Sequence, residues 1–120
     1  PAMILGDRLR LEQVIINLLR NALDATKTVK NPTVEVLVAV GDTVILTVRD
    51  NGEGIEDLDA LFEPFYTTKQ PGDGVGLGLA ISSGIVNDLG GRLTARNGVN
   101  GGAVFEVRLP IITTDVKAAE

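Results

Sequence analysis

Apolar residues recur at spacings of three and four over the first part of the chain, which is the period of an amphipathic helix. The positions that carry this spacing are Leu11, Ile15, Leu18, Ala22 and Ala25. Asp7 is a favourable N-cap residue, and Asn31-Pro32 stops the pattern. The spacing therefore predicts a helix from Arg8 to about Val29.

Two stretches that alternate apolar and polar residues follow this helix. The stretch from Thr33 to Val40 has valine at every even position, and the alternation returns from Thr43 to Arg49 after Gly41-Asp42. A period of two predicts strands, and a two-residue turn of this composition predicts a hairpin. The short apolar stretch from Pro1 to Gly6 is interpreted as an additional edge strand.

The second half of the chain repeats the two periods in the same order. Helical spacing extends from Gly76 to Leu89 and stops at Gly90-Gly91. Alternating residues from Arg92 to Asn97 and from Ala103 to Leu109 predict two further strands, joined by a turn over 98–102. Residues 55–73 show no period, and they are interpreted as a functional loop or lid. A small satellite hydrophobic cluster is the alternative for that segment.

Composition limits the possible functions. The 120 residues are 44% apolar, which fits one compact domain over residues 1–110 with a tail over 111–120. A net charge of −5 and an aromatic content of 3% argue against a nucleic-acid surface. The sequence contains no cysteine and no histidine. Catalysis must therefore rest on carboxylates, amides, the backbone and bound ions.

A polar stripe follows the first predicted helix. Its members are Gln13, Asn17, Arg20, Asn21 and Asp24. A solvated helix face would show the same spacing, and this interpretation stays open. Asparagine is a poor residue for a helix interior, however, and two of them one turn apart suggest a role for their amide groups.

Two glycine-containing segments are further candidates for chemistry. Residues 50–54 read Asp-Asn-Gly-Glu-Gly and place a carboxylate at the end of a strand, although an ordinary turn uses the same residues. Residues 72–78 carry glycine at alternate positions and lead into the second helix, so their backbone amides are suited to an anion. A flexible linker is the alternative. Neither a P-loop nor a dinucleotide-binding pattern is present.

The order of these segments resembles the ATP-binding catalytic domain of sensor histidine kinases, in the superfamily that also contains DNA gyrase, Hsp90 and MutL. The resemblance rests on an N box at residues 17–22, a G1 box at 50–54, an F box at 62–65 and a G2 box at 74–79. Residues 101–105 resemble the last glycine motif, with Ala103 where many members have threonine. The run at 63–69 is similar to the nitrogen-regulator and C4-dicarboxylate sensor branch.

The resemblance implies an α+β fold, a two-layer α/β sandwich in which helices cover one face of a mixed β-sheet, known as the Bergerat-type ATP-binding fold. It implies that Asp50 accepts a hydrogen bond from the adenine amino group and that Asn21 and Asn17 bind Mg²⁺. Asn17, Arg20 and Asn21 are the implied catalytic residues. The implied ATP contacts are Asn17, Arg20, Asn21, Asp50, Gly52, Gly54, Ile55, Phe62, Phe65, Thr68, Lys69, Gly74, Val75, Gly76, Leu77, Gly78 and Leu79.

The implied function is transfer of the γ-phosphate of Mg·ATP to a histidine on a separate dimerisation domain. Hydrolysing superfamily members keep a glutamate at the position of Asn17, and an amide cannot act as that base. Glu12, five residues earlier, points about 140° away on the helix. Alternatives are a conformational module of the gyrase or chaperone type and a non-catalytic nucleotide-binding domain.

The resemblance also implies the setting of the domain. The isolated domain is expected to be monomeric. The full-length protein is expected to be a homodimer anchored in the bacterial inner membrane, with this domain in the cytoplasm. A response regulator is expected to be an indirect partner, and nucleic acid is not.

Overall fold

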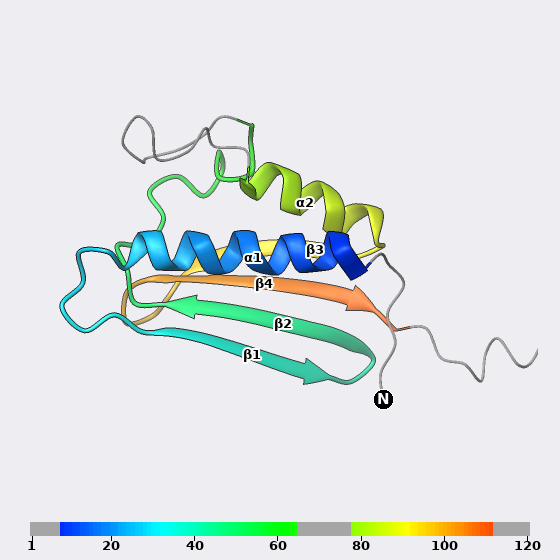
Figure 1. The fold of residues 1–120 in the computed structure, drawn as a ribbon, viewed down its shortest axis with the longest axis horizontal. Helices are drawn as coiled ribbons and strands as arrows, with labels where there is room; N and C mark the ends of the chain where they lie inside the picture. The colour runs from blue at the N-terminus through cyan, green and yellow to red at the C-terminus, as the bar shows by residue number, and fades with distance from the viewer. Residues whose placement is uncertain (1–7, 65–77, 112–120) are drawn as a thin grey trace, which may run out of the picture.

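The computed structural model describes residues 8–64 and 78–111, and in them two helices lie on one face of a four-stranded sheet (Figure 1). In chain order the elements are α1 (Arg8–Ala25), β1 (Val34–Val40), β2 (Thr43–Asp50), α2 (Gly78–Asp88), β3 (Arg92–Asn97) and β4 (Ala103–Pro110). Each agrees in type with the element predicted there. The predicted α+β two-layer sandwich is confirmed.

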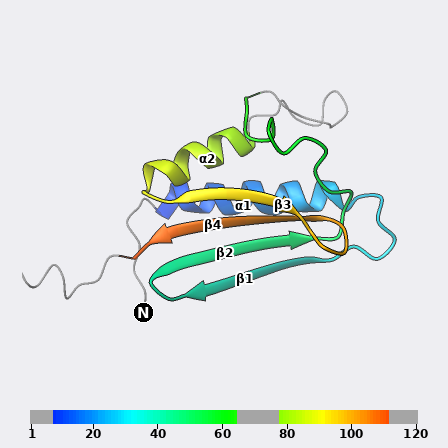
Figure 2. The same cartoon turned by 180° about the vertical axis from the view of Figure 1, so that it is seen from behind.

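The sheet has the strand order β1-β2-β4-β3, so β1 and β3 form its edges (Figure 2). Every strand pair in the described part of the chain is antiparallel. The mixed sheet that we expected is therefore not found among these strands. The hairpins account for the β1-β2 and β3-β4 pairs, because a short turn can join only antiparallel neighbours. The additional strand expected over residues 1–6 lies outside the described residues.

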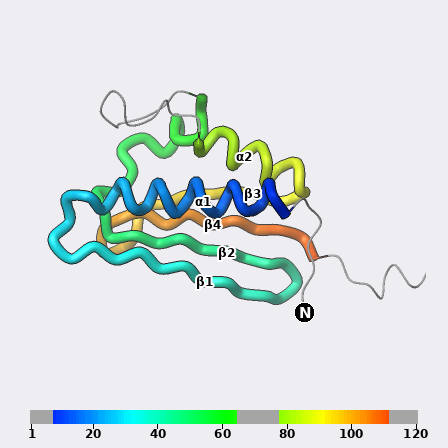
Figure 3. The backbone as a smooth tube through the Cα atoms, in the orientation of Figure 1, coloured from blue at the N-terminus to red at the C-terminus, as the bar shows by residue number. Residues whose placement is uncertain are grey.

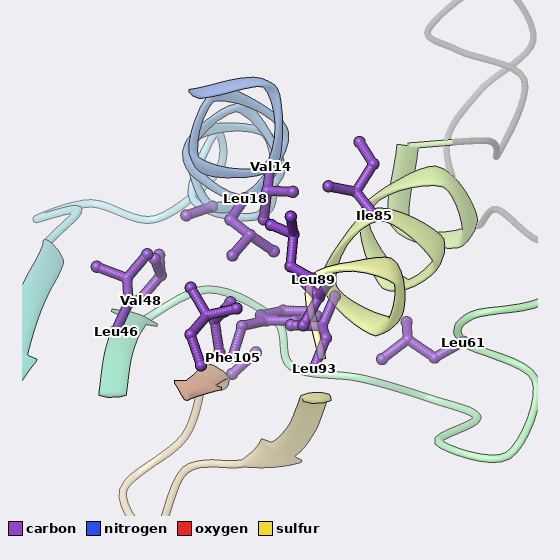
Figure 4. Packing of buried hydrophobic residues seen from close by; sticks show 14 residues of the cluster. Val14, Leu18, Leu46, Val48, Leu61, Ile85, Leu89, Leu93 and Phe105 are labelled. Atoms are coloured by element: carbon purple, nitrogen blue, oxygen red, sulfur yellow. The ribbon is translucent and has the colours of Figure 1, made fainter. Parts of the chain in front are cut away.

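The core lies between the helices and one face of the sheet (Figure 4). Strand register places Val48 of β2 beside Phe105 of β4, and Leu46 beside Val107. Residues directly opposite each other in an antiparallel pair project from the same face, so these side chains form continuous apolar rows. The helices cover the rows with the buried residues Val14, Leu18, Ala22, Ile85 and Val86, and Leu89, just after α2, adds to this set.

The opposite face of the sheet carries charged side chains. Arg49 lies 3.5 Å from Glu35 on the neighbouring strand, and Glu106 lies 3.1 Å from Arg108 and 3.9 Å from Arg96. Ion pairs this exposed contribute little to stability. This face is therefore the solvated one, which is typical of an antiparallel sheet with helices on a single side.

The alternating apolar residues of β1 and β2 differ in how deeply they are buried. Val36 and Val38 are on the helix-facing side, opposite Val48 and Leu46, but Val38 is 63% exposed whereas Val48 is 0% exposed. Both helices pack over the strands further in, and β1 is left at the edge (Figure 1). The periodicity predicted the strand correctly, but it did not predict that its apolar side would remain exposed.

Alanine substitutions should distinguish the buried side of β2 from the exposed side of β1 by their effects on stability. We expect Val48→Ala to lower the free energy of unfolding by roughly 2 kcal/mol, because it removes buried methyl groups and leaves a cavity. Val38→Ala should change it by less than about 0.5 kcal/mol, since that side chain is already in water. Urea denaturation of both variants measures the difference. Equal losses would contradict the edge position of β1.

Local contacts explain where the helices end. Helix α1 stops at Ala25 and not at about Val29, because the backbone N–H groups that follow donate to carbonyls only three residues back, Lys27 to Asp24 at 3.3 Å and Val29 to Thr26 at 3.1 Å. Such bonds tighten the last turn and satisfy carbonyls at a helix end. Helix α2 ends as predicted before Gly90-Gly91, where the Gly91 N–H donates to the Val86 carbonyl at 2.9 Å.

Candidate functional site

Segments that are distant in the sequence meet near the C-terminal end of α1. The chain leaves β2, passes this helix end and then runs toward the start of α2 (Figure 3). The turn at Gly52 lies against the Ala25 backbone, and the first residue of β4, Ala103, contacts Asp50. The predicted G1 box, the last glycine motif and the end of α1, three residues after the predicted N box, are thus brought together by the fold.

Asp50 is the central polar residue of this region. It is the last residue of β2 and is only 3% exposed. Its Oδ1 accepts hydrogen bonds from the backbone N–H groups of Gly52 at 2.8 Å and Ala103 at 3.3 Å. Its Oδ2 is buried and has no partner among the described residues. A buried acceptor left unpaired is costly, and a ligand that donates a hydrogen bond would satisfy it.

Two glycines allow the backbone to pack this closely around Asp50. A Cβ atom on Gly52 would overlap the carbonyl of Ala25 at the end of α1. A Cβ atom on Gly102 would overlap the carbonyl of Asp50, and Gly102 also has a φ of 75°, which side-chain-bearing residues rarely adopt. Both positions therefore need glycine for a steric reason, and Gly102 was not among the predicted site residues.

The segment at 50–54 is also a turn in its own right, so the ordinary interpretation of its residues is partly correct. The Asn51 amide joins it to the loop before β1: its Oδ1 accepts from the Thr33 N–H and its Nδ2 donates to the Asn31 carbonyl, both at 2.9 Å. These bonds fix the strand end. They hold the backbone that carries Asp50, so the role of Asn51 is structural.

Asn97 is another residue that the sequence did not single out. Its Oδ1 accepts from the Ile55 N–H at 2.7 Å, and its Nδ2 donates to the Ile55 carbonyl at 3.2 Å. It thereby fixes the backbone just after the G1 box. The available signal was its position at the end of β3 before a glycine-rich turn, which is too common to indicate a partner 42 residues away.

The polar stripe on α1 faces α2 over part of its length. The Asn17 Nδ2 donates to Ser82 Oγ at 3.1 Å and to the Gly78 carbonyl at 3.4 Å. Asn21 is half-buried one turn further, and no described residue hydrogen-bonds its amide, whereas Arg20 is exposed. The solvated-face interpretation is therefore wrong for Asn17. Glu12 instead pairs with Arg8 at 3.1 Å on the surface.

Several predicted contact residues use their side chains in the core. Ile55, Phe62 and Leu79 are partly buried against the core cluster, and Leu61 is a member of it. The first part of the 55–73 segment thus packs on the main core and does not form the separate satellite cluster considered as an alternative. The predicted site residues that lie outside the described residues are Phe65, Thr68, Lys69, Gly74, Val75, Gly76 and Leu77.

Within residues 8–64 and 78–111, no helix has the length and apolar character to cross a membrane.

The described part of the site combines a buried carboxylate acceptor at Asp50, two amide side chains on α1 and the amino end of α2. These groups suit a ligand with a hydrogen-bond donor at one end and negative charge at the other.

Comparison with known proteins finds relatives that are named as sensor proteins. The chain is 46% identical over 119 residues to the two-component sensor PprA of Pseudomonas aeruginosa, covering 91% of this chain and 13% of that protein. It is 48% identical over 109 residues to the C4-dicarboxylate transport sensor protein DctB of Rhizobium meliloti, covering 88% and 17%. The chain thus spans less than a fifth of the length of these two relatives.

Solved structures with the same fold include the catalytic domain of the histidine kinase ThkA, with a TM-score of 0.74 and 36% identity over 88% of this chain and 68% of that one. The mycobacterial sensor histidine kinase MprB has a TM-score of 0.81 and 26% identity, covering 92% and 78%. The family model described as histidine kinase-, DNA gyrase B- and HSP90-like ATPase matches residues 6–113. The chain belongs to this ATPase family, whose description implies nucleotide binding.

Proposed function

We propose that this chain binds Mg·ATP and transfers the γ-phosphate to a histidine on a separate dimerisation domain, as the catalytic domain of a two-component sensor histidine kinase. The observation that carries the nucleotide part is the buried, unpaired Oδ2 of Asp50. Adenine presents an amino donor where guanine presents a carbonyl acceptor. An ionised carboxylate only accepts, so Asp50 selects adenine.

The kinase part of the proposal is supported by the relatives. PprA is named as a two-component sensor, and ThkA as a histidine kinase whose catalytic domain has this fold. The chain itself contains no histidine, so it has no acceptor of its own. A dimerisation domain of the same protein is the proposed acceptor, and a response regulator is the proposed final recipient. We further propose a membrane-anchored homodimer that holds this domain in the cytoplasm.

The residues of the N box fit a magnesium ion. Asn17 and Asn21 lie one turn apart on α1, and amide oxygens are ligands that this hard cation accepts. A bound Mg²⁺ would neutralise phosphate charge as the γ-phosphoryl group is transferred. Arg20 and Lys69 are the proposed phosphate contacts, and the backbone amides near Gly76 and Gly78 would hold further phosphate oxygens.

The amide at position 17 favours phosphotransfer over hydrolysis. Attack by water needs a base to accept its proton, and the Asn17 amide cannot serve. Glu12 is held at the surface by Arg8. An imidazole acceptor supplies its own nucleophilic nitrogen and so does not depend on a base at this position.

Mixing the chain with a separate acceptor-histidine domain and γ-labelled ATP tests the proposal. We expect label on the acceptor, lost when its histidine is replaced, and little release of inorganic phosphate by the chain alone. An unlabelled acceptor, with ATP bound to a folded chain, would count against phosphotransfer. Rapid hydrolysis that Asn17→Ala leaves unchanged would favour a module of the gyrase type.

A further inference from the structure

Ser82 is a fully buried polar residue on α2, with 0% exposure, and its hydroxyl contacts the N box. The Asn17 Nδ2 lies 3.1 Å from Ser82 Oγ and 3.4 Å from the Gly78 carbonyl. Gly78 is the first residue of α2 and Ser82 lies one turn later, so the two contacts fall at the start of the first and second turns of this helix. A single amide thus joins the middle of α1 to the start of α2.

These contacts determine which end of the Asn17 amide is free. The Gly78 carbonyl can only accept a hydrogen bond, so the group that faces α2 must be the donating NH₂. The oxygen Oδ1 is consequently directed away from these two partners. Fixing one end of a side chain by a hydrogen bond is how proteins orient groups that bind metals through the other end.

We propose that Ser82 is a positioning residue of the nucleotide site: it holds the NH₂ of Asn17 so that Oδ1 is presented to the cation that accompanies ATP. This inference rests on the proposed binding of Mg·ATP. The same hydrogen bond places the first turn of α2, whose amino end follows the glycine-rich segment. Cation binding at the N box and the position of the α2 amino end are therefore coupled through one side chain.

Removing the Ser82 hydroxyl should weaken the contribution of Mg²⁺ to the affinity for ATP. We expect Ser82→Ala to lower the affinity for ATP about 10-fold in the presence of Mg²⁺, and less than about twofold when Mg²⁺ is replaced by a chelator. Calorimetry of residues 1–120 with ATP under both conditions measures this. The Asn17 side-chain NH₂ resonances of the nucleotide-free protein should also shift in Ser82→Ala, which reports the hydrogen bond without ATP.

Matched variants keep the test decisive. Ser83→Ala makes the same change at the next residue of α2, which is not a partner of Asn17, and should leave both affinities unchanged. If Ser82→Ala fails to fold, Ser82→Cys replaces it, because a thiol still fills the space of the hydroxyl but its sulfur is a weak acceptor. If Mg²⁺ raises the ATP affinity of a folded Ser82 variant as much as that of the unmodified chain, the positioning role of Ser82 is wrong, while the proposed function stands. Failure of the unmodified chain to bind ATP would overturn the proposed function as well.

Discussion

Replacing Asp50 with asparagine should lower the affinity for ATP by about 100-fold or more while the fold is retained. The amide oxygen of the new residue can still accept from the Gly52 and Ala103 N–H groups, which hold the carboxylate at 2.8 and 3.3 Å. The group at the position of Oδ2 becomes an NH₂, so a donor would face the amino donor of adenine. A hydrogen bond is lost and a repulsion is gained, which together account for about 2.7 kcal/mol.

Calorimetry with ATP measures this loss, and Asp42→Asn is the matched control. Asp42 lies exposed in the turn between β1 and β2, so the same change of charge is made away from the site. The control should bind ATP like the unmodified chain, and thermal unfolding should show both variants folded. Affinity for ATP that Asp50→Asn leaves intact would refute the adenine assignment.

Replacing Gly102 with alanine should lower the free energy of unfolding by about 4 kcal/mol and abolish ATP binding with it. A Cβ atom there would overlap the Asp50 carbonyl, and the residue would also be held at a φ of 75°. The backbone conformation alone costs about 1–3 kcal/mol for a residue with a side chain. The overlap adds to this, because it involves rigid backbone at the end of β2.

Gly101→Ala separates these two costs. Gly101 has a φ of 99°, but a Cβ atom there would meet no other atom within 4 Å. Its substitution should therefore cost only the backbone term, about 1–2 kcal/mol, and spare the position of Asp50. Urea denaturation of the two variants gives the difference. Equal losses would mean that the close packing of Gly102 on Asp50 is unimportant.

The candidate site was predictable to the extent that its signals are local. Asp50 could be proposed because a carboxylate followed by glycines ends an alternating strand, and Asn17 and Asn21 because asparagine is unfavourable inside a helix. Ser82 and Asn97 gave no such signal. Their significance depends on partners 65 and 42 residues away, and one sequence carries no information about those contacts.

The two helices and four strands of the described part follow from the sequence pattern alone, because periods of 3.6 and two are imposed by backbone geometry and need no knowledge of neighbours. Which apolar faces are buried depends on tertiary packing. β1 and β2 share one pattern, yet Val38 is exposed and Val48 is buried, because burial depends on where the helices pack. The tertiary structure also left one oxygen of Asp50 buried and unpaired, because that required Ala103, Gly52 and Gly102 to converge on it.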